Sequence, residues 1–269
     1  MTKTILITGS TDGLGLATAQ ALAANGHSVL LHGRSQAKLD DAEQQVRAVG
    51  GTGQIDSYRA DLSDLDEVAA LASAVMADHP HIDVLINNAG VFRTPKPTAP
   101  NGLDIRFVVN TIAPYLLTRQ LMPALGPEAR VINLSSAAQA PVDPDALLGR
   151  RSLDDSTAYA QSKLALTMWS NHLAARLGAD GPAVIAVNPG SFLGTKMVKE
   201  AYGSSGKDIG IGADILTRAA TSEEFAAASG RYFDNDSGRF ANPHPDALDP
   251  KRTAAVVDLI DSTIATLQR

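Results

Sequence analysis

Short apolar segments alternate with helical segments from Lys3 onward, and this alternation constrains the fold more than any other feature of the sequence. Each apolar segment has the length and the β-branched residues of a buried strand, whereas the segments between them end in Asn or Gly, as helices do. Such a repeat predicts a parallel sheet with helices on both faces. The predicted strands are Lys3–Thr8, Ser28–His32, Gln54–Arg59 and Ile82–Ile86, and the predicted helices are Leu14–Ala24, Gln36–Val49 and one in which Leu65, Val68, Leu71 and Val75 recur.

Three features refine this pattern. Ser63 with Asp66 three residues later predicts a capping box at the start of the third helix. The rest of the chain continues the alternation. Its predicted strands are Arg130–Leu134, Ala183–Val187 and the edge strand Arg231–Phe233, and a loop is predicted over Ala137–Thr157. Its predicted helices are Leu103–Met122, bent around Pro114, Ala158–Leu177, the short Thr195–Ala201 and Ala213–Ala220, and Thr253–Leu267, in which Val256, Val257, Ile260 and Ile264 face inward. No linker divides the chain, so we expect residues 1–269 to form one α/β domain, a doubly wound parallel sheet of about seven strands with helices on both faces.

Composition excludes several classes of function. A net charge of -6 without a dense Lys/Arg run argues against a nucleic-acid surface, and the absence of cysteine excludes disulfides and thiolate chemistry. No metal site is expected, because the histidines (27, 32, 79, 81, 172 and 244) lack ligand spacing, and we interpret all of them as structural or solvent-exposed. The N-terminus runs directly into a strand and no apolar run approaches about 18 residues, so we expect a cytoplasmic protein without a membrane span.

A glycine-rich turn joins the first predicted strand to the first predicted helix. Glycines let a backbone approach a pyrophosphate, and the helix N-terminus presents unpaired N–H groups to it. The candidate cofactor-binding residues of this turn are Gly9, Ser10, Thr11, Gly13, Leu14 and Gly15. The spacing is not G-x-G-x-x-G, and an ordinary flexible turn is the alternative.

Arg34 follows the second predicted strand, where an NAD-specific site carries an acidic residue for the ribose 2′-hydroxyl. A guanidinium suits a 2′-phosphate by charge and by its forked geometry. We therefore predict NADP(H) in preference to NAD(H). A solvated arginine at a helix start is the alternative.

Tyr159 and Lys163 are four residues apart on a predicted helix, so the phenol and the ammonium project from one face. A phenol has an unperturbed pKa of about 10, and a nearby cation favours its ionised form. The pair therefore suits proton exchange with a carbonyl or alcohol oxygen. By spacing alone, a packed aromatic beside a solvated charge is the usual interpretation.

Together these segments resemble the short-chain dehydrogenase/reductase family over nearly the whole chain, which implies a Rossmann fold. Five ordered motifs carry the resemblance: the TGxxxGxG turn (Thr8, Gly9, Gly13, Gly15), NNAG (Asn87 to Gly90), the helix asparagine (Asn110), the serine (Ser136) and YxxxK (Tyr159, Lys163).

The resemblance implies hydride transfer between a nicotinamide and a carbonyl or secondary alcohol carbon. It makes Tyr159 the general acid/base, places Lys163 on the nicotinamide ribose, Ser136 on the substrate oxygen, and Asn110 on a water-linked proton path from Lys163. The remaining cofactor contacts that it implies are Asp61 and Leu62 at the adenine, Asn88, Ala89 and Gly90 on the ribose side, and Pro189 and Gly190 at the nicotinamide face.

Two departures from the family pattern stand out. The threonine that often follows the Pro-Gly turn is replaced by Gly194, with Thr195 one residue later, and the segment between Ser136 and Tyr159 is long. This segment and Ser229–Phe233 are similar to the retinol-dehydrogenase-like and WW-domain-oxidoreductase-like branch, which favours apolar substrates. The candidate substrate-lining residues are Phe92, Thr94, Ala138, Gln139, Phe192 and Leu193.

Other functions stay open at this point. A C=C double-bond reductase is one alternative. A catalytically silent NADP-binding sensor or scaffold is another, but such a protein should tolerate loss of the Tyr/Lys pair, whereas Ser136, Asn110, Tyr159 and Lys163 are all intact here. The partner that we expect is a small-molecule carbonyl or alcohol. The sequence does not settle whether the chain forms a homo-oligomer, because Met168 and Trp169 on the Tyr159 helix suit either an interface or the core.

Overall fold

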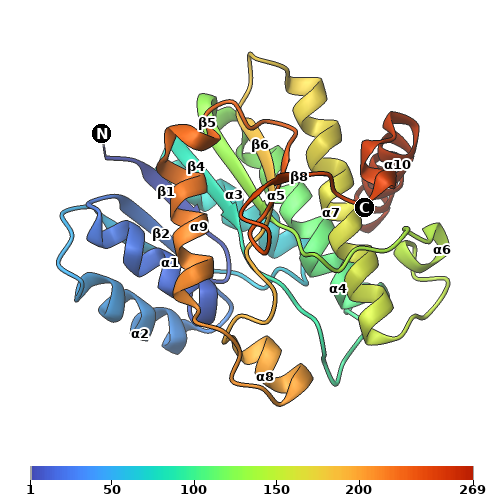
Figure 1. Ribbon diagram of the computed structural model, residues 1–269, viewed down its shortest axis with the longest axis horizontal. Coiled ribbons are helices and arrows are strands. Elements are labelled where there is room, and N and C mark those ends of the chain that lie inside the picture. The colour runs from blue at the N-terminus through green and yellow to red at the C-terminus, as the bar shows by residue number, and fades with distance from the viewer. Residues whose placement is uncertain (1, 269) are drawn as a thin grey trace.

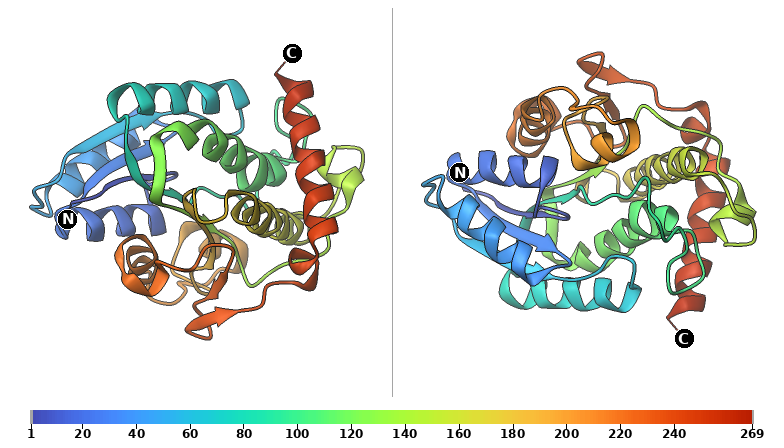
Figure 2. Two further views of the ribbon diagram at one scale, coloured as in Figure 1. Left: turned by 90° about the horizontal axis from the view of Figure 1, so that it is seen from above. Right: turned by 90° about the horizontal axis from the view of Figure 1, so that it is seen from below.

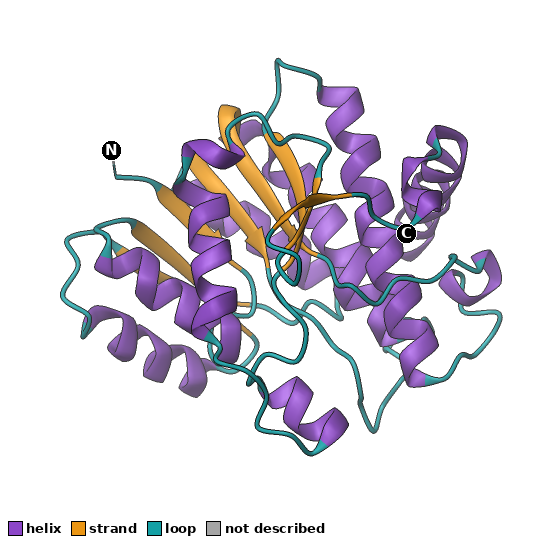
Figure 3. Ribbon diagram, viewed as in Figure 1, coloured by secondary structure: helices purple, strands orange, loops and turns teal. Residues whose placement is uncertain are grey.

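One twisted sheet of eight strands runs through the molecule, and this computed structural model describes residues 2–268 (Figures 1 and 3). The strand order is β3-β2-β1-β4-β5-β6-β7-β8, and every neighbouring pair is parallel except β7 with β8. The strands are β1 (Thr4–Ile7), β2 (Ser28–Gly33), β3 (Ile55–Arg59), β4 (Ile82–Asn87), β5 (Leu125–Leu134), β6 (Ala183–Asn188), β7 (Tyr232–Asp234) and β8 (Arg239–Ala241). The order reverses between β1 and β4, and ligands of doubly wound folds bind at such a point.

Helices cover both faces of the sheet, as the two edge-on views of Figure 2 show. Alternate side chains of each strand point to opposite faces: Ile5 and Ile7 pack with α1, α2 and α9, whereas Leu6 packs on the side of α3, α5 and α7. The helices are α1 (Gly13–Ala24), α2 (Gln36–Arg47), α3 (Leu65–Asp78), α4 (Ile105–Phe107), α5 (Ala113–Leu121), α6 (Pro144–Leu147), α7 (Asp155–Leu177), α8 (Lys196–Tyr202), α9 (Gly210–Thr221) and α10 (Pro250–Leu267). The predicted α/β fold with helices on both faces is confirmed.

The C-terminal part of the sheet differs from the prediction. All six strands predicted before residue 188 form, but β7 is not an edge strand, because the chain turns at Gly238 and adds β8 as an antiparallel neighbour. Gly238 has φ +68°, a conformation that glycine adopts without strain. The sheet therefore has eight strands instead of about seven, and β8 is too short for its alternation to be recognised in the sequence.

Three helix starts were predicted wrongly because aspartate caps were overlooked; one of them is α10, which begins at Pro250 behind the cap Asp249 and not at Thr253. Asp154 accepts hydrogen bonds from the backbone N–H groups of Ser156 and Thr157, so α7 begins at Asp155, three residues before the predicted Ala158. Asp64 caps α3 in the same way, and the predicted capping box at Ser63 does not form. The Ser63 hydroxyl donates instead to Asp61. The predicted loop 137–157 also contains α6, whose N-terminus Asp143 caps.

The predicted long helix 103–122 is divided by a π-helical segment, Val108–Ile112, between α4 and α5. The irregular turns precede Pro114, which lies in the first turn of α5, where a proline needs no N–H partner. Such π-helical turns are frequent at functional sites, and this one contains Asn110.

The terminal helix α10 packs against α7 on its outer side, as the edge-on views show (Figure 2). Val256, Val257, Ile260 and Ile264 are buried, as predicted, and Tyr115 and Arg119 of α5 both donate hydrogen bonds to Asp261 of α10. Met168 and Trp169 are 2% and 0% exposed, so in this structure they belong to the core. Among residues 2–268, no helix combines the length and apolar character needed to cross a membrane.

We expect Ile260→Ala to lower the free energy of unfolding by about 2–5 kcal/mol, because it leaves a cavity between α10 and α7. Leu248→Ala is the control, because Leu248 is 53% exposed and its truncation should change the value by no more than about 0.5 kcal/mol. Urea unfolding followed by circular dichroism measures both. Equal effects of the two substitutions would show that α10 does not belong to the cooperative core.

Candidate active site

The glycine-rich turn packs directly against the Asn88–Gly90 segment after β4. A Cβ on Gly9, which has φ +65°, would lie 2.9 Å from the Ala89 Cα atom. A Cβ on Gly15 would lie 2.3 Å from the Gly9 carbonyl oxygen and 2.5 Å from Asn88 Nδ2. Both glycines are therefore required by close backbone approach, and two segments distant in sequence form one surface.

Thr8 and Asn88 hold these segments together. The Thr8 hydroxyl accepts hydrogen bonds from the backbone N–H groups of Asn88 (3.0 Å) and Ala89 (3.1 Å). The Asn88 amide donates to the Thr8 and Gly9 carbonyls, both at 2.9 Å. The Asn88 side chain thus holds the turn in place, whereas a Cβ on Gly90 would lie 3.5 Å from Asn110 Oδ1 and 3.6 Å from Lys163 Nζ.

The start of α1 suits an anionic group such as a pyrophosphate. Within residues 2–268 no side chain caps this helix, and its first turn carries no acidic residue. A Cβ on Gly13 would meet its nearest neighbour only at 4.0 Å, on the Thr195 methyl group, so this part of the turn is open. Uncapped N–H groups beside open space fit the phosphates of a dinucleotide, so the residues at the start of α1 suit the predicted cofactor.

Neighbouring segments of the fold contact the other residues of the turn, Ser10, Thr11 and Leu14. Ser10 is fully buried and exchanges hydrogen bonds with the backbone of His32. Thr11 lies over Gly33, where a Cβ would come within 2.4 Å of the Thr11 methyl group. Leu14 is 8% exposed and packs against Gly212.

The adenosine end of the candidate site lies at β2 and β3. Arg34 is exposed next to the start of α2, and in the described chain that helix has neither a side-chain cap nor an acid in its first turn. Lys38 lies one turn further along α2 and pairs with Asp12 at 3.2 Å. Asp61 and Leu62 follow β3, where Asp61 accepts from Ser63 and its backbone N–H bonds Glu67.

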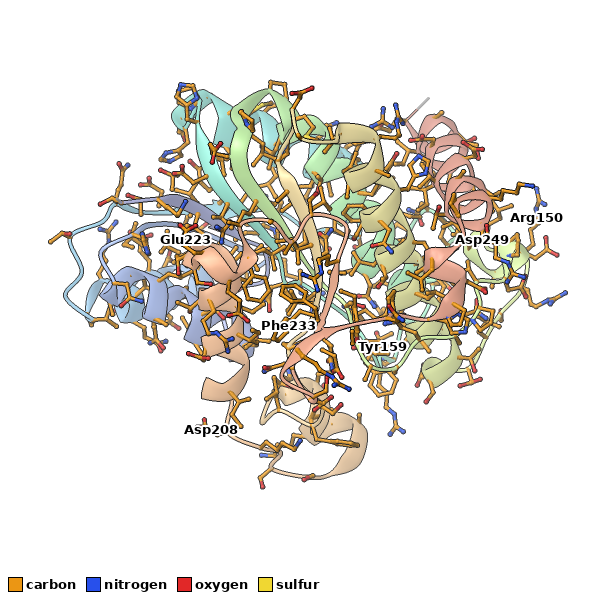
Figure 4. All side chains as sticks on the ribbon, turned by 45° about the horizontal axis from the view of Figure 1, so that its top comes forward. Arg150, Tyr159, Asp208, Glu223, Phe233 and Asp249 are labelled. Atoms are coloured by element: carbon orange, nitrogen blue, oxygen red, sulfur yellow. The ribbon has the colours of Figure 1, made fainter. Side chains whose placement is uncertain are left out.

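Lys163 is buried on α7 beside Tyr159. Its ammonium group donates to the Leu134 carbonyl at 2.6 Å and lies 5.7 Å from the centre of the Tyr159 ring. Burial disfavours the cation and lowers the pKa of Lys163 to about 8. The Tyr159 ring contacts Phe92, with 4.9 Å between ring centres. Figure 4 shows Tyr159 to the right of Phe233, on the α7 side of the view.

Asn110 joins three segments of the site. Its side chain accepts from Val91 N–H (2.8 Å) and donates to the Val91 carbonyl (2.9 Å) and the Ser162 hydroxyl (3.0 Å). The amide of Asn110 is thus engaged in holding the chain after Gly90 against α7. Both amide hydrogens of Asn110 are therefore used, and its Oδ1 atom keeps one lone pair that can accept a hydrogen bond from a water.

Ser136 lies just after β5, two residues beyond the carbonyl that Lys163 contacts. Its hydroxyl accepts from the Ala138 N–H at 3.1 Å, and its carbonyl accepts from Gln139 (2.9 Å) and Tyr232 (3.2 Å). Ala138 is exposed, and Gln139 also accepts from the His244 N–H. These contacts fix the start of the long segment before α7.

The segment after β6 covers the open side of the glycine turn, and it contains Pro189, Gly190 and Thr195. Thr195 caps α8, and its methyl group faces Gly13. A side chain at 194 is excluded, because a Cβ on Gly194 would lie 2.8 Å from the Ser205 carbonyl oxygen. The departure from the family threonine thus has a steric cause, and Thr195 is the threonine that approaches the turn.

Sequence reasoning missed a carboxylate that fastens this segment. Asp236, in the β7–β8 turn, accepts from the Asn188 amide (2.9 Å) and from the backbone N–H of Ser191 (2.9 Å), and its side chain lies 3.8 Å from Lys207. These bonds hold the pKa of Asp236 below its usual value although burial opposes the shift. Nothing local in the sequence marks Asp236, because its partners lie about 30 to 50 positions away.

A buried arginine was also missed. Arg106 is 0% exposed and donates to Asp104 (2.8 and 2.5 Å) and to Asp155, the first residue of α7. Its guanidinium also lies 3.5 Å from the Phe92 carbonyl oxygen. Only the nearby Asp104 hints at this pairing in the sequence. No group of three or more potential His, Cys, Asp or Glu metal ligands occurs in the part of the chain that the structure describes.

Comparison with known proteins agrees with this geometry. Residues 3–205 match the model of the short chain dehydrogenase family. The chain belongs to this family. Human retinol dehydrogenase 13 is 32% identical over 267 residues, which cover 92% of this chain and 80% of that protein. The family resemblance and its retinol-dehydrogenase-like character are thus confirmed.

Solved structures share the fold over most of the chain. An uncharacterised protein from Mycobacterium Paratuberculosis has a TM-score of 0.80 and 28% identity, and the match covers 97% of this chain and 92% of that one. A metagenomic short-chain oxidoreductase in complex with NADP has a TM-score of 0.64 and 31% identity, and the match covers 82% and 92%. The short-chain dehydrogenase described here is therefore an NAD(P)-dependent oxidoreductase that acts on alcohol or carbonyl groups.

We expect the stability of the ligand-free enzyme to depend on the ionisation of Lys163. Between its folded pKa of about 8 and its ordinary value of 10.5, the unfolded chain binds more protons than the folded chain. The free energy of unfolding should therefore rise with pH through this window, by about 1–3 kcal/mol relative to Lys163→Met, which lacks the titrating group. Urea unfolding of both proteins at pH 7.5 and pH 10 measures the difference, and parallel values would contradict the shift.

Proposed function

We propose that this enzyme is an NADP(H)-preferring oxidoreductase for a ketone, aldehyde or secondary alcohol, with Tyr159 as general acid/base. The observation that carries the proposal is the buried Lys163 beside Tyr159, held by the Leu134 carbonyl next to Ser136. A buried amine with a lowered pKa near a phenol is typical of a catalytic site rather than of a solvated surface charge.

Each residue of this site has a defined task. Tyr159 donates its phenolic proton to the carbonyl oxygen during reduction and takes a proton from the alcohol during oxidation. The Lys163 cation favours negative charge on the phenol oxygen, and its remaining N–H groups can bond a ribose. Ser136 presents its hydroxyl to the substrate oxygen, and Asn110 keeps the chain after Gly90 against α7. The nicotinamide, when bound, supplies or accepts the hydride.

The cofactor residues fit the same proposal. The turn Gly9–Gly15 and the uncapped start of α1 receive the pyrophosphate, and Asn88, Ala89 and Gly90 border the ribose. Asp61 and Leu62 border the adenine, and Pro189, Gly190 and Thr195 face the nicotinamide. Arg34, exposed beside the uncapped start of α2, is placed for a 2′-phosphate, which supports NADP(H) over NAD(H).

An apolar substrate is supported by the Phe92 ring beside Tyr159 and by two apolar side chains in the segment after β6. Phe92 contacts the Tyr159 ring, and Phe192 is 53% exposed with φ +57°, a backbone conformation uncommon outside glycine. Leu193 is buried beside Gly190. The retinol dehydrogenases that this chain resembles carry an apolar alcohol in their name, which agrees with this preference. We further propose that the whole chain forms one NAD(P)-binding domain; the cytoplasmic location stays a prediction.

Tyr159→Phe should lower kcat by about 10²–10⁴-fold, because the ring remains but the transferable proton is lost. The Kd for NADPH should change less than about threefold. Stopped-flow turnover of a panel of apolar ketones and fluorescence titration of NADPH measure the two effects. Tyr58→Phe, which removes a phenol from β3, is the matched control. A turnover close to that of the control would refute the assigned role.

Arg34→Ala should weaken NADPH binding by about 10- to 100-fold through loss of a charged hydrogen bond to the 2′-phosphate. NADH, which lacks that phosphate, should lose less than about threefold. Arg252→Ala, on an exposed arginine of α10, controls for the loss of one positive charge. Isothermal titration with both dinucleotides decides the matter, and an equal loss for both would exclude recognition of the 2′-phosphate by Arg34.

A further inference from the structure

The imidazole of His32 is buried between the glycine-rich turn and the end of β3. His32 is 3% exposed and is the penultimate residue of β2. Its Nδ1 atom lies 3.1 Å from the Gly9 backbone nitrogen, and its Nε2 atom lies 3.1 Å from the Ala60 carbonyl oxygen. One ring thus connects two segments on opposite sides of β2.

These contacts require a single form of the ring. The Gly9 N–H is a donor, so Nδ1 must accept with its lone pair, and the Ala60 carbonyl is an acceptor, so Nε2 must carry the proton. Burial disfavours the cation and lowers the pKa of His32 to about 4, although the Ala60 carbonyl and the Asp61 carboxylate act in the opposite direction. The neutral ring therefore satisfies both buried backbone groups at neutral pH.

The backbone of His32 strengthens the same connection. Its N–H donates to the Ser10 hydroxyl at 2.9 Å, and its carbonyl accepts from the Ser10 N–H at 2.9 Å. The neighbouring Gly33 carbonyl accepts from the Ala60 N–H at 3.1 Å. The ring is the part of this arrangement that reaches both Gly9 and Ala60, and it is the part that a substitution can remove.

We propose that His32 is a positioning residue for the dinucleotide, because its ring sets Gly9 and Ala60 at a fixed separation. Gly9 begins the turn assigned to the pyrophosphate, and Ala60 precedes Asp61 and Leu62, assigned to the adenine. His32 touches neither group and acts through the two backbone segments. The inference rests on the proposed cofactor contacts and adds to them a residue that spans the two halves of the adenosine diphosphate site.

An apolar side chain at position 32 would fill the space but would leave the Gly9 N–H and the Ala60 carbonyl without their partner. Buried backbone groups without partners are costly, so the local structure would shift to find other ones. A shift of Gly9 is transmitted to the uncapped start of α1, because the turn is only a few residues long. Cofactor affinity should therefore depend on the ring nitrogens and not only on the volume of the side chain.

Two substitutions separate the ring nitrogens. In His32→Asn the amide oxygen replaces Nδ1, so the Gly9 N–H keeps its acceptor and the Ala60 carbonyl loses its donor. In His32→Gln the amide nitrogen replaces Nε2, so Ala60 keeps its donor and Gly9 loses its acceptor. Each variant loses one hydrogen bond, and their thermal unfolding midpoints without ligand should therefore be similar.

We expect His32→Gln to weaken NADPH and NADH binding by about tenfold, because Gly9 begins the turn assigned to the charged pyrophosphate. We expect His32→Asn to weaken both by about threefold, because Ala60 only precedes the residues assigned to the uncharged adenine. Both dinucleotides should change by the same factor, because the ring of His32 contacts Gly9 and Ala60 and not Arg34. At saturating cofactor, kcat should be unchanged in both variants. Isothermal titration gives Kd, and steady-state kinetics give kcat and KM separately.

The outcomes divide clearly. Equal affinity of His32→Gln and the wild-type enzyme, or a fall in kcat at saturation, overturns the positioning role. Failure of the wild-type enzyme to bind either dinucleotide overturns the proposed function instead. If His32→Gln does not fold, nitrogen NMR of the wild-type ring decides: a proton on Nε2 and a bare Nδ1 with a slowly exchanging Gly9 amide support the proposal, and a proton on Nδ1 contradicts it.

Discussion

The close approach of Gly9 and Gly15 to the chain after β4 is the constraint on which the rest of the site depends. A side chain at either position would collide with the segment after β4, because a Cβ on Gly9 would lie 2.9 Å from Ala89 and a Cβ on Gly15 would lie 2.5 Å from Asn88. Thr8 and Asn88 convert this contact into four hydrogen bonds, so the two segments behave as one unit. Because β1 and β4 are neighbours where the strand order reverses, this unit lies where the fold leaves its opening for a ligand.

The proposed chemistry of the site depends on the ammonium group of Lys163, whose burial costs free energy of folding. Lys163 is buried, and its ammonium group donates a hydrogen bond to the Leu134 carbonyl. A stable fold alone would favour an apolar side chain here, because burying a charge is unfavourable. The proposed action of the cation on Tyr159 and on a bound ribose therefore explains the lysine at this position, and packing does not.

The six strands before residue 188 and most residues of the candidate site could be identified from the sequence, because they follow from local patterns. The glycine spacing, the Asn87–Gly90 segment and the Tyr159–Lys163 pair each lie within a few residues of one another. Features formed by distant partners were not predictable: His32 meets Gly9 and Ala60 across the sheet, Arg106 meets Asp155, and Asp236 meets Ser191. The strand β8 and the aspartate caps were missed because three residues and one carboxylate give too weak a pattern.

The Asp236 contacts have a consequence for how this enzyme can diverge. Ser191 and Lys207 both approach one carboxylate, and Leu193 and Lys207 pair as a β-bridge, so the chain between them is a loop whose ends are already joined. The entropy of closing such a loop grows only with the logarithm of its length. The part of this segment after Thr195, which carries α8, can therefore lengthen, shorten or change sequence while β6, Gly190, Thr195 and the glycine turn stay in place. In evolution this part of the segment can be exchanged while the residues around the proposed cofactor site stay the same.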